Sequence, residues 1–381
     1  MRILFYLPVV TPWWFDAIVV PMLRALNDGR AELHVMVAPL WRNTGIDGGQ
    51  LAPLGDLANV HWHVVDEDDP DQFRLAGADV PGLLDLIAVI APDITLARSA
   101  DFAIARQFPG IVRFLMEGGA APFATDPCWI ILEEEPFVQA PIPAGAIALA
   151  DACAEQIAPT WDMVARHRPR GTRAALRGAM GLPDDRTVIA LPLHYEHEEN
   201  YFLHRAALPD GITMIERVLA ALGDETVLAV TDHPLNRLHV DRRMLDEHMN
   251  RKGDRLVHCT GPRATERLAL CADAMAVDLS KSWSLAAFHG LPLIDLGGRL
   301  RAGWINAAPG PAATGLAAPD PAEARRWFGW HLGARVIDPS LFSLDRLIRT
   351  LDLAPSEADI AGNIAMLLAQ QQAFAEQAAA A

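Results

Sequence analysis

Cysteine and positive charge are both scarce in this chain, and each shortage excludes a class of protein. The four cysteines lie far apart with no paired spacing, which predicts reduced thiols and not a disulfide framework. The 32 lysines and arginines are outnumbered by 48 aspartates and glutamates. The resulting net charge of −16 argues against a nucleic-acid-binding surface, so nucleic acid is not an expected partner.

Several sequence signatures are also absent. No apolar run approaches the length that spans a bilayer, and the opening Met-Arg-Ile-Leu-Phe-Tyr-Leu-Pro is too short for a signal peptide. No Gly-x-Gly-x-x-Gly follows a predicted strand, and no Walker loop or Gly-x-Ser-x-Gly elbow occurs, so NAD binding and ATP hydrolysis are disfavoured. We expect a soluble cytoplasmic protein, with the inner face of the membrane as an alternative location.

Arginines cluster locally between Arg166 and Arg177. This stretch could be a solvated helix face or a linker, or it could meet an anionic acceptor or a lipid surface. We therefore expect at most peripheral membrane contact through the Arg166–Arg177 patch. Five arginines make up this patch: Arg166, Arg168, Arg170, Arg173 and Arg177.

Apolar runs alternate with helical patterns along the whole chain, whose 381 residues suffice for two α/β domains. Strands alternating with helices predict doubly wound parallel sheets. In the first half, strands are expected at 2–7, 32–37, 60–65, 94–97, 110–116 and 129–132. One helix is expected to begin at Thr11-Pro12 and to end at residues 27–29. Further helices are expected at 81–90, 100–107 and 144–156. In the second half, strands are expected at 187–191, 226–230, 255–259, 274–279 and 291–296. Helices are expected at 213–222, 241–250, 265–271, 323–331 and 344–351, and a long loop at 301–320.

These elements predict the fold class α/β, with two Rossmann-like doubly wound domains facing a central cleft. The expected division is an N-terminal acceptor domain at 1–165, a linker at 166–185, and a C-terminal donor domain at 186–355. Residues 356–381 are expected to form a C-terminal helix that packs back on the N-terminal domain.

Residues 275–297 combine two short apolar strands with a cluster of hydroxyls at the start of the intervening helix, which Gly290 ends. Free backbone N–H groups and the helix dipole favour an anion at such a corner. One serine could simply cap the helix, but several together with a lysine favour a phosphate site. The cluster comprises Ser280, Lys281, Ser282 and Ser284.

Two ionisable residues follow strands at the edge where parallel sheets bind ligands. Glu117 precedes two glycines, of which Gly118 leaves room for a ligand near the backbone, and a carboxylate there can act as a general base. Alternatively, Glu117 caps a helix or pairs with Arg113. His233 precedes Pro234 and can donate to a phosphate oxygen, or it is a hydrogen-bonded core histidine.

Aromatic and histidine-rich loops offer weaker signals. Trp13 and Trp14 could stack on a sugar ring or cover the sheet. Residues 194–199 read His-Tyr-Glu-His-Glu-Glu, but no further pair of ligands has matching spacing, so no metal site is predicted.

Together, Glu117-Gly118, His233-Pro234 and the serines of 280–284 resemble the three motifs of bacterial CMP-sugar glycosyltransferases of the GT-B fold. That group includes the capsule-polysaccharide Kdo transferases and bacterial sialyltransferases. The resemblance covers the order of elements over most of the chain, and 227–297 is its most specific part.

The resemblance implies a role for each motif. Glu117 would deprotonate the acceptor hydroxyl, and His233 would support the departing CMP phosphate. The serine cluster would hold that phosphate, and Thr260-Gly261 would lie near the cytosine and ribose. Donor-binding residues are thus Pro234, Thr260, Gly261, Ser280, Lys281, Ser282 and Ser284, and acceptor-binding residues are Trp13, Trp14 and Gly118.

The chain departs from that family at some positions. Met116 stands where many members have a second acid, and the serines alternate with Lys281 and Trp283. No glutamate occupies 285–287, where many UDP-sugar enzymes of this fold use one to hold the ribose. This absence favours a CMP-linked donor over a UDP-linked one.

The resulting expectation is a metal-independent glycosyltransferase with no cofactor beyond its nucleotide-sugar substrate. It would move an acidic, Kdo-like sugar from CMP to a surface-polysaccharide (capsule) or glycolipid acceptor. The alternatives are a CDP-alditol phosphotransferase or another nucleotide-sugar enzyme of the same fold, and a non-catalytic nucleotide- or sugar-binding protein.

Overall fold

The computed structural model describes residues 1–251, 253–310 and 315–380, and these form two compact α/β units. The first unit comprises Met1–Gly119, Asp126–Pro136 and Ala334–Asn363. The second comprises Ala120–Thr125, Phe137–Gly333 and Ile364–Ala381.

The first unit is built on six strands. These are β1 Arg2–Leu7, β2 Glu32–Val37, β3 Val60–Val64, β4 Ile94–Ala97, β5 Ile111–Glu117 and β6 Ile130–Glu133. Its helices are α1 Pro12–Trp14, α2 Val20–Leu26, α3 Gly48–Leu51, α4 Gln72–Leu75, α5 Leu83–Ile90, α6 Phe102–Ala105 and α16 Leu344–Leu351, and a π-helical turn at Phe15–Val19 joins α1 to α2.

The second unit contains β7 Thr187–Pro192, β8 Thr226–Thr231, β9 Leu256–His258, β10 Ala274–Val277, β11 Leu293–Asp295 and β12 Ala308–Pro309. Its helices are α7 Ile147–Gln156, α8 Ala158–Arg166, α9 Arg173–Ala179, α10 Gly211–Ala221, α11 Asn236–His239, α12 Arg243–Arg251, α13 Ala264–Cys271, α14 Ser282–His289 and α15 Pro321–Gly329. The last helix, α17 Glu357–Ala380, has its first residues in the first unit and the rest in the second.

Both sheets have the strand order of a Rossmann fold. The first runs β3-β2-β1-β4-β5-β6 and the second β12-β11-β10-β7-β8-β9, so in each the order reverses beside the unit's first strand. The prediction of two Rossmann-like α/β units is therefore confirmed. The first sheet is not entirely parallel, since its edge strand β6 runs antiparallel to β5. The predicted cleft between the two units stays a prediction.

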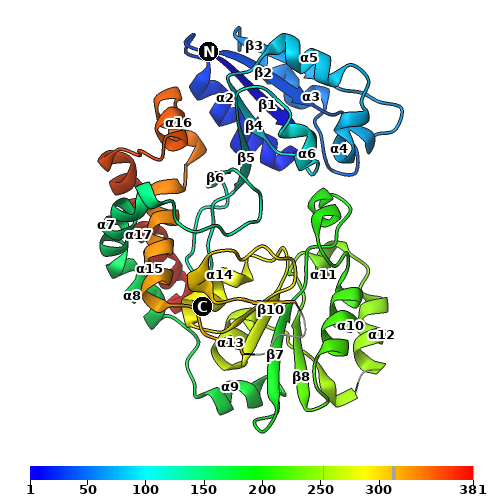
Figure 1. Ribbon diagram of the computed structural model, residues 1–381, viewed down its shortest axis with the longest axis vertical. Helices are drawn as coiled ribbons and strands as arrows, with labels where there is room; N and C mark the ends of the chain where they lie inside the picture. Colours follow the sequence, from blue (N-terminus) through cyan, green and yellow to red (C-terminus); the bar gives the residue numbers. More distant parts are fainter. Residues whose placement is uncertain (252, 311–314, 381) are drawn as a thin grey trace. The chain divides into compact units, whose positions relative to one another are not determined.

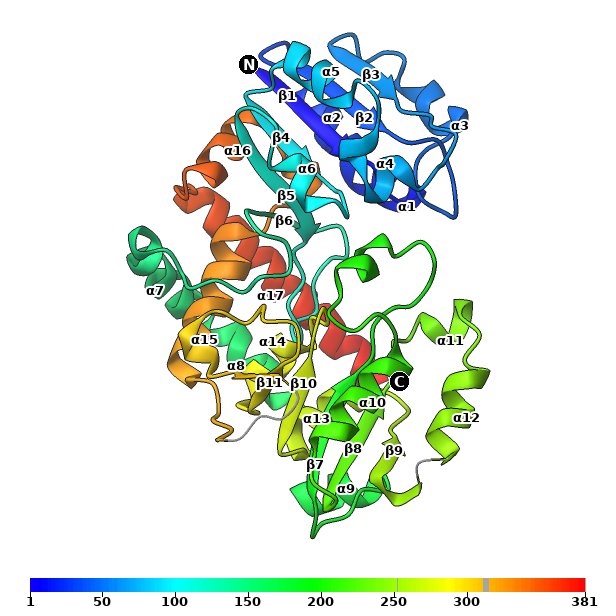
Figure 2. The same cartoon turned by 45° about the vertical axis from the view of Figure 1, so that its right-hand side comes forward.

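Helices cover both faces of each sheet. In the first unit, α2 and α16 pack on the face that carries Phe5 and Val35, while Phe73 of α4 packs edge-on against Tyr6 on the other face. Figure 2 shows α16 and α6 on opposite sides of β4 and β5. In the second unit, α10 and α12 supply the core on one face, and α13 and α14 contact the strands on the other (Figure 1).

The predicted domain boundaries differ from the observed units. The division at 165 falls inside α8, which belongs to the second unit, and the chain returns to the first unit at Ala334. The expected linker at 166–185 contains α9. Long-range pairing explains this difference, because Arg177 of α9 is buried and its guanidinium contacts Asp273 at 2.7 Å. Arg177 is therefore not part of an exposed basic patch.

The remaining expectations concern the long loop and the chain's end. The loop predicted at 301–320 contains the short strand β12, and its residues 311–314 lie outside the described residues, as does Ala381 of the predicted C-terminal helix. No helix in the described part of the chain is long and apolar enough to cross a membrane.

Candidate functional site

His233 follows β8 at the carboxyl edge of the second sheet. The backbone N–H of Leu235 donates to its Nδ1 at 3.3 Å, so a neutral ring carries its proton on Nε2. The ring also packs against Tyr195, with 5.2 Å between centroids. Burial lowers the pKa of His233, and nearby His194 lowers it further, while Asp232 opposes the shift. At neutral pH the side chain is thus an uncharged Nε2–H donor.

A buried polar network fixes the loop that holds His233. Asp232 accepts hydrogen bonds from Arg242 at 2.9 and 3.0 Å and from the Asn236 amide at 2.7 Å. Arg242 also pairs with Glu196, whose other oxygen accepts from the N–H of Gly211 at the start of α10. The loops after β7 and β8 are therefore tied to α10 and α12 through charged side chains that are almost fully buried.

A cavity of about 460 Å³ lies at the ends of β8 and β9. Pro234, Thr260 and Gly261, all predicted to bind the donor, line it together. Gly261 has a φ of +96°, a conformation in which L side chains are strained. The structure thus brings these residues to one hollow at the edge where parallel sheets bind ligands.

Two groups of paired polar side chains line this cavity. In one group, Arg237 contacts the His258 ring at 3.0 and 3.2 Å. In the other, Glu266 of α13 accepts from Arg263 and lies 3.4 Å from His289. Burial raises the pKa of Glu266, but the hydrogen bonds from His289 and Arg263 more than offset this and bring it below its ordinary value. Glu266 is therefore ionised at neutral pH.

The serine cluster lies at the corner between β10 and α14. The Ser280 hydroxyl donates to the Ser282 oxygen at 3.0 Å and accepts from the Ser282 N–H at 3.2 Å. Gly290 ends α14 with a φ of +70°, as predicted. Two half-buried hydroxyls thus meet at the first turn of the helix, where backbone N–H groups favour an anion.

Ser284 does not belong to this pair. Its side chain is buried, and its hydroxyl donates back to the Lys281 carbonyl at 2.8 Å. The predicted contact of Ser284 with a donor is corrected accordingly, because its proton is used inside the helix.

The helix α14 connects the serine corner to the cavity. Leu285 lines the cavity, and Ser282 lies three residues earlier on the same helix. Residues at this spacing are neighbours on a helix surface, about 5–6 Å apart at Cβ. Ser282 therefore lies one helical turn from a residue of the cavity wall, although it does not line the cavity itself.

Glu117 is the last residue of β5 in the first unit. Its Oε1 accepts from the Arg98 guanidinium at 2.7 Å, while Arg113, the partner considered from the sequence, pairs with Glu134 at 2.8 Å. The adjacent Gly118 is buried, and a Cβ there would lie 3.1 Å from both the Ile130 carbonyl and the Val336 side chain. The room expected beside Gly118 is thus filled by the protein itself, and its predicted acceptor contact is corrected.

The two adjacent tryptophans have different environments. Trp13 is 53% exposed, whereas Trp14 is only 3% exposed, with the Arg98 guanidinium 4.2 Å above its ring centroid. Trp14 therefore cannot stack on a sugar as predicted, because its ring is buried under a side chain. Of the two, Trp13 alone retains an exposed ring, in the short helix α1 that follows β1.

Metal ligands do not converge in the described part of the chain, where no group of three or more His, Cys, Asp or Glu could hold an ion.

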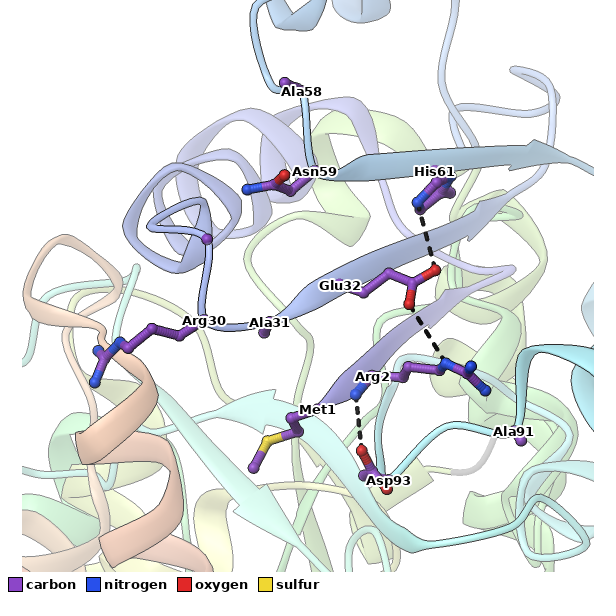
Figure 3. A pocket seen from close by; sticks show the side chains of 11 residues that line it. Met1, Arg2, Arg30, Ala31, Glu32, Ala58, Asn59, His61, Ala91 and Asp93 are labelled. Atoms are coloured by element: carbon purple, nitrogen blue, oxygen red, sulfur yellow. Dashed lines mark hydrogen bonds and ion pairs between the residues drawn. The ribbon is translucent and has the colours of Figure 1, made fainter.

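A second hollow, of about 440 Å³, lies at the amino edge of the first sheet, the opposite edge from Glu117. Figure 3 shows Glu32 at its centre between Arg2 and His61, at 3.4 and 3.5 Å. Its central charged groups are already paired, and parallel sheets bind ligands at the other edge.

Several residues of these sites were not found from the sequence. Arg98 was given no role, and Arg242, Asn236 and Glu266 were not singled out. Their contacts in the folded chain show their importance: Arg98 pairs with Glu117, Arg242 bridges Asp232 and Glu196, and Glu266 lies beside His289.

Some solved structures are similar to this chain at low identity. Thermosulfurimonas dismutans KpsC, a beta Kdo 2,7 transferase, is 14% identical over 83% of this chain and 97% of that chain, with a TM-score of 0.45. E. coli ADP-heptose LPS heptosyltransferase II is 10% identical over 78% and 84%, with a TM-score of 0.25. Anabaena Alr3699/HepE in complex with UDP is 13% identical over 100% of both chains, with a TM-score of 0.29.

No family model and no curated protein matches the chain. Because the identities and TM-scores of the solved structures are low, the function is inferred from this chain's own residues.

Proposed function

We propose that the protein is a glycosyltransferase that moves an acidic, Kdo-like sugar from a CMP donor to a saccharide or glycolipid acceptor. The observation that supports this most is the cavity at the carboxyl edge of the second sheet. Pro234, Thr260 and Gly261 line it together with Leu285 of α14, the helix whose start carries the Ser280–Ser282 hydroxyl pair. A nucleoside in the cavity would direct its phosphate toward the first turn of α14.

The second unit would stabilise the leaving group. As the sugar–phosphate bond breaks, the CMP phosphate gains a second negative charge. The Ser282 hydroxyl and the N-terminal N–H groups of α14 can donate to its oxygens, and the Nε2–H of His233 can do the same. Because the ring of His233 is neutral at pH 7, it would act as a hydrogen-bond donor and not as a cation.

The first unit would activate the acceptor. The Glu117 carboxylate would take the proton of the attacking hydroxyl as the acceptor oxygen forms its bond to the anomeric carbon. The products are the glycosylated acceptor, CMP and a proton that Glu117 releases to water. A guanidinium at 2.7 Å favours the ionised carboxylate, which is the form a base needs.

Ligand-dependent thermal stability tests the donor assignment. The melting temperature should rise with CMP and CMP-linked sugars more than with CDP or UDP at equal concentration, because a ligand that binds only the folded state stabilises it. A response to UDP alone would overturn the CMP assignment. A preference for CDP would favour an alditol-phosphate transfer by the same phosphate site.

A matched pair of serine variants tests the phosphate site. Ser282→Ala should weaken CMP binding about tenfold, the effect of losing a hydrogen bond to a charged group. Ser284→Ala should leave CMP affinity unchanged, since that hydroxyl donates to the Lys281 carbonyl. Isothermal titration calorimetry with CMP measures both, and equal effects of the two substitutions would contradict the site.

A further inference from the structure

Arg98 lies where the strand order of the first sheet reverses. It follows β4 directly, its backbone N–H donates to the Tyr6 carbonyl of β1 at 2.8 Å, and its carbonyl accepts from the N–H of Val9. The residue thus sits between β1 and β4, the switch point at which doubly wound sheets bind ligands.

The guanidinium of Arg98 is buried against the end of β5 and the Trp14 ring. It donates to the Leu115 carbonyl at 3.2 Å and to Glu117 Oε1 at 2.7 Å, and its Cζ lies 4.2 Å from the centroid of the Trp14 ring. The Arg98 side chain is 9% exposed, while that of Glu117 is 35% exposed. The cation is therefore enclosed, and the carboxylate that it holds reaches solvent.

We propose that Arg98 is a positioning residue for Glu117, with the Trp14 ring as the support that holds the guanidinium in place. This inference rests on the proposed function of Glu117 as the base. Arg98 would not touch the substrate itself. It would fix the direction of the carboxylate and keep it ionised.

The arrangement differs from an ordinary surface ion pair. Exposed pairs hold side chains weakly, because water screens the charges and both chains must be ordered. Here the arginine is buried, and a tryptophan face adds a cation–π contact. Neither of the other charged residues of β5 and β6 pairs with Arg98 or Glu117. Arg113 of β5 pairs with Glu134, and Glu133 of β6 pairs with Arg335. Trp14, which cannot stack on a sugar, acquires a role through this contact.

Titration of Glu117 in the ligand-free protein tests this inference directly. The carboxyl carbons of ¹³C-labelled glutamates report protonation by NMR, and loss of one signal in Glu117→Gln identifies the resonance. Arg98→Met should raise the pH midpoint of Glu117, because a neighbouring cation favours the charged form. Arg113→Met, which removes an arginine from the same strand, should leave that midpoint unchanged.

Two further variants cover the case in which Arg98→Met does not fold. Arg98→Lys keeps the charge but loses the planar fork, and Trp14→Leu keeps the arginine but loses its support. Both should raise the midpoint by less than Arg98→Met. An unchanged Glu117 midpoint in the folded variants would overturn the positioning role. This outcome is separate from the donor test, since failure of CMP to bind would overturn the proposed function and leave the titration result intact.

Discussion

Replacing Glu117 by Gln should lower sugar transfer by about 10²- to 10⁴-fold, the range expected when a general base is lost. Gln is similar in size and can still accept a hydrogen bond from Arg98, so the fold of the β5 end should be kept. It cannot take up the proton of the acceptor hydroxyl. The melting-temperature rise with CMP should be unchanged, because the proposed CMP site is built from residues of the second unit alone.

Glu134→Gln is the matched control for this prediction. Glu134 also pairs with an arginine, but its side chain is 79% exposed and it has no proposed part in transfer. Its substitution should leave the rate of transfer within about twofold, as expected of an exposed ion pair. Transfer is measured as CMP released from a CMP-linked acidic sugar in the presence of a saccharide acceptor. Full activity of Glu117→Gln would show that another group is the base, and CMP binding without any transfer by the native protein would favour a non-catalytic role.

Much of the fold could be predicted from the sequence because its signals are local. A buried parallel strand appears as a short apolar run, so β1, β2 and β4 lie at the residues expected. The start of α1 at Thr11-Pro12 and the end of α14 at Gly290 were equally clear. Each of these features depends on a few consecutive residues, whose side chains favour one backbone conformation.

The path of the chain between the units could not be predicted in the same way. Residues 126–136 and 334–363 join the first unit through pairings such as that of Ile130 with Ile337, more than 200 positions apart. Nothing in either segment's own composition indicates its partner. The pairing of Glu117 with Arg98 instead of Arg113 has the same cause, because the parallel neighbour β4 brings Arg98 to the end of β5.

The second large effect is expected at Arg242, whose loss should destabilise the second unit by about 3–5 kcal/mol. The side chains of Asp232 and Glu196, its two carboxylate partners, are 3% and 14% exposed. Arg242→Met would fill much of the same space but leave both charges buried without their cation. Both carboxylates are largely withdrawn from water, so the cost of burying their charges would no longer be offset. Urea unfolding followed by tryptophan fluorescence and circular dichroism measures the loss.

The neighbouring Arg243 provides the control. Its side chain is 85% exposed and pairs with Asp241, so Arg243→Met should destabilise the protein far less than Arg242→Met. The two variants remove the same charge at adjacent positions of one helix start, so overall charge and helix propensity are matched. A comparable loss for both would mean that the Asp232–Arg242–Glu196 network does not stabilise the loop. If the network does hold the loop after β8, Arg242→Met should also reduce the CMP-induced rise in melting temperature, because His233 and Pro234 directly follow Asp232.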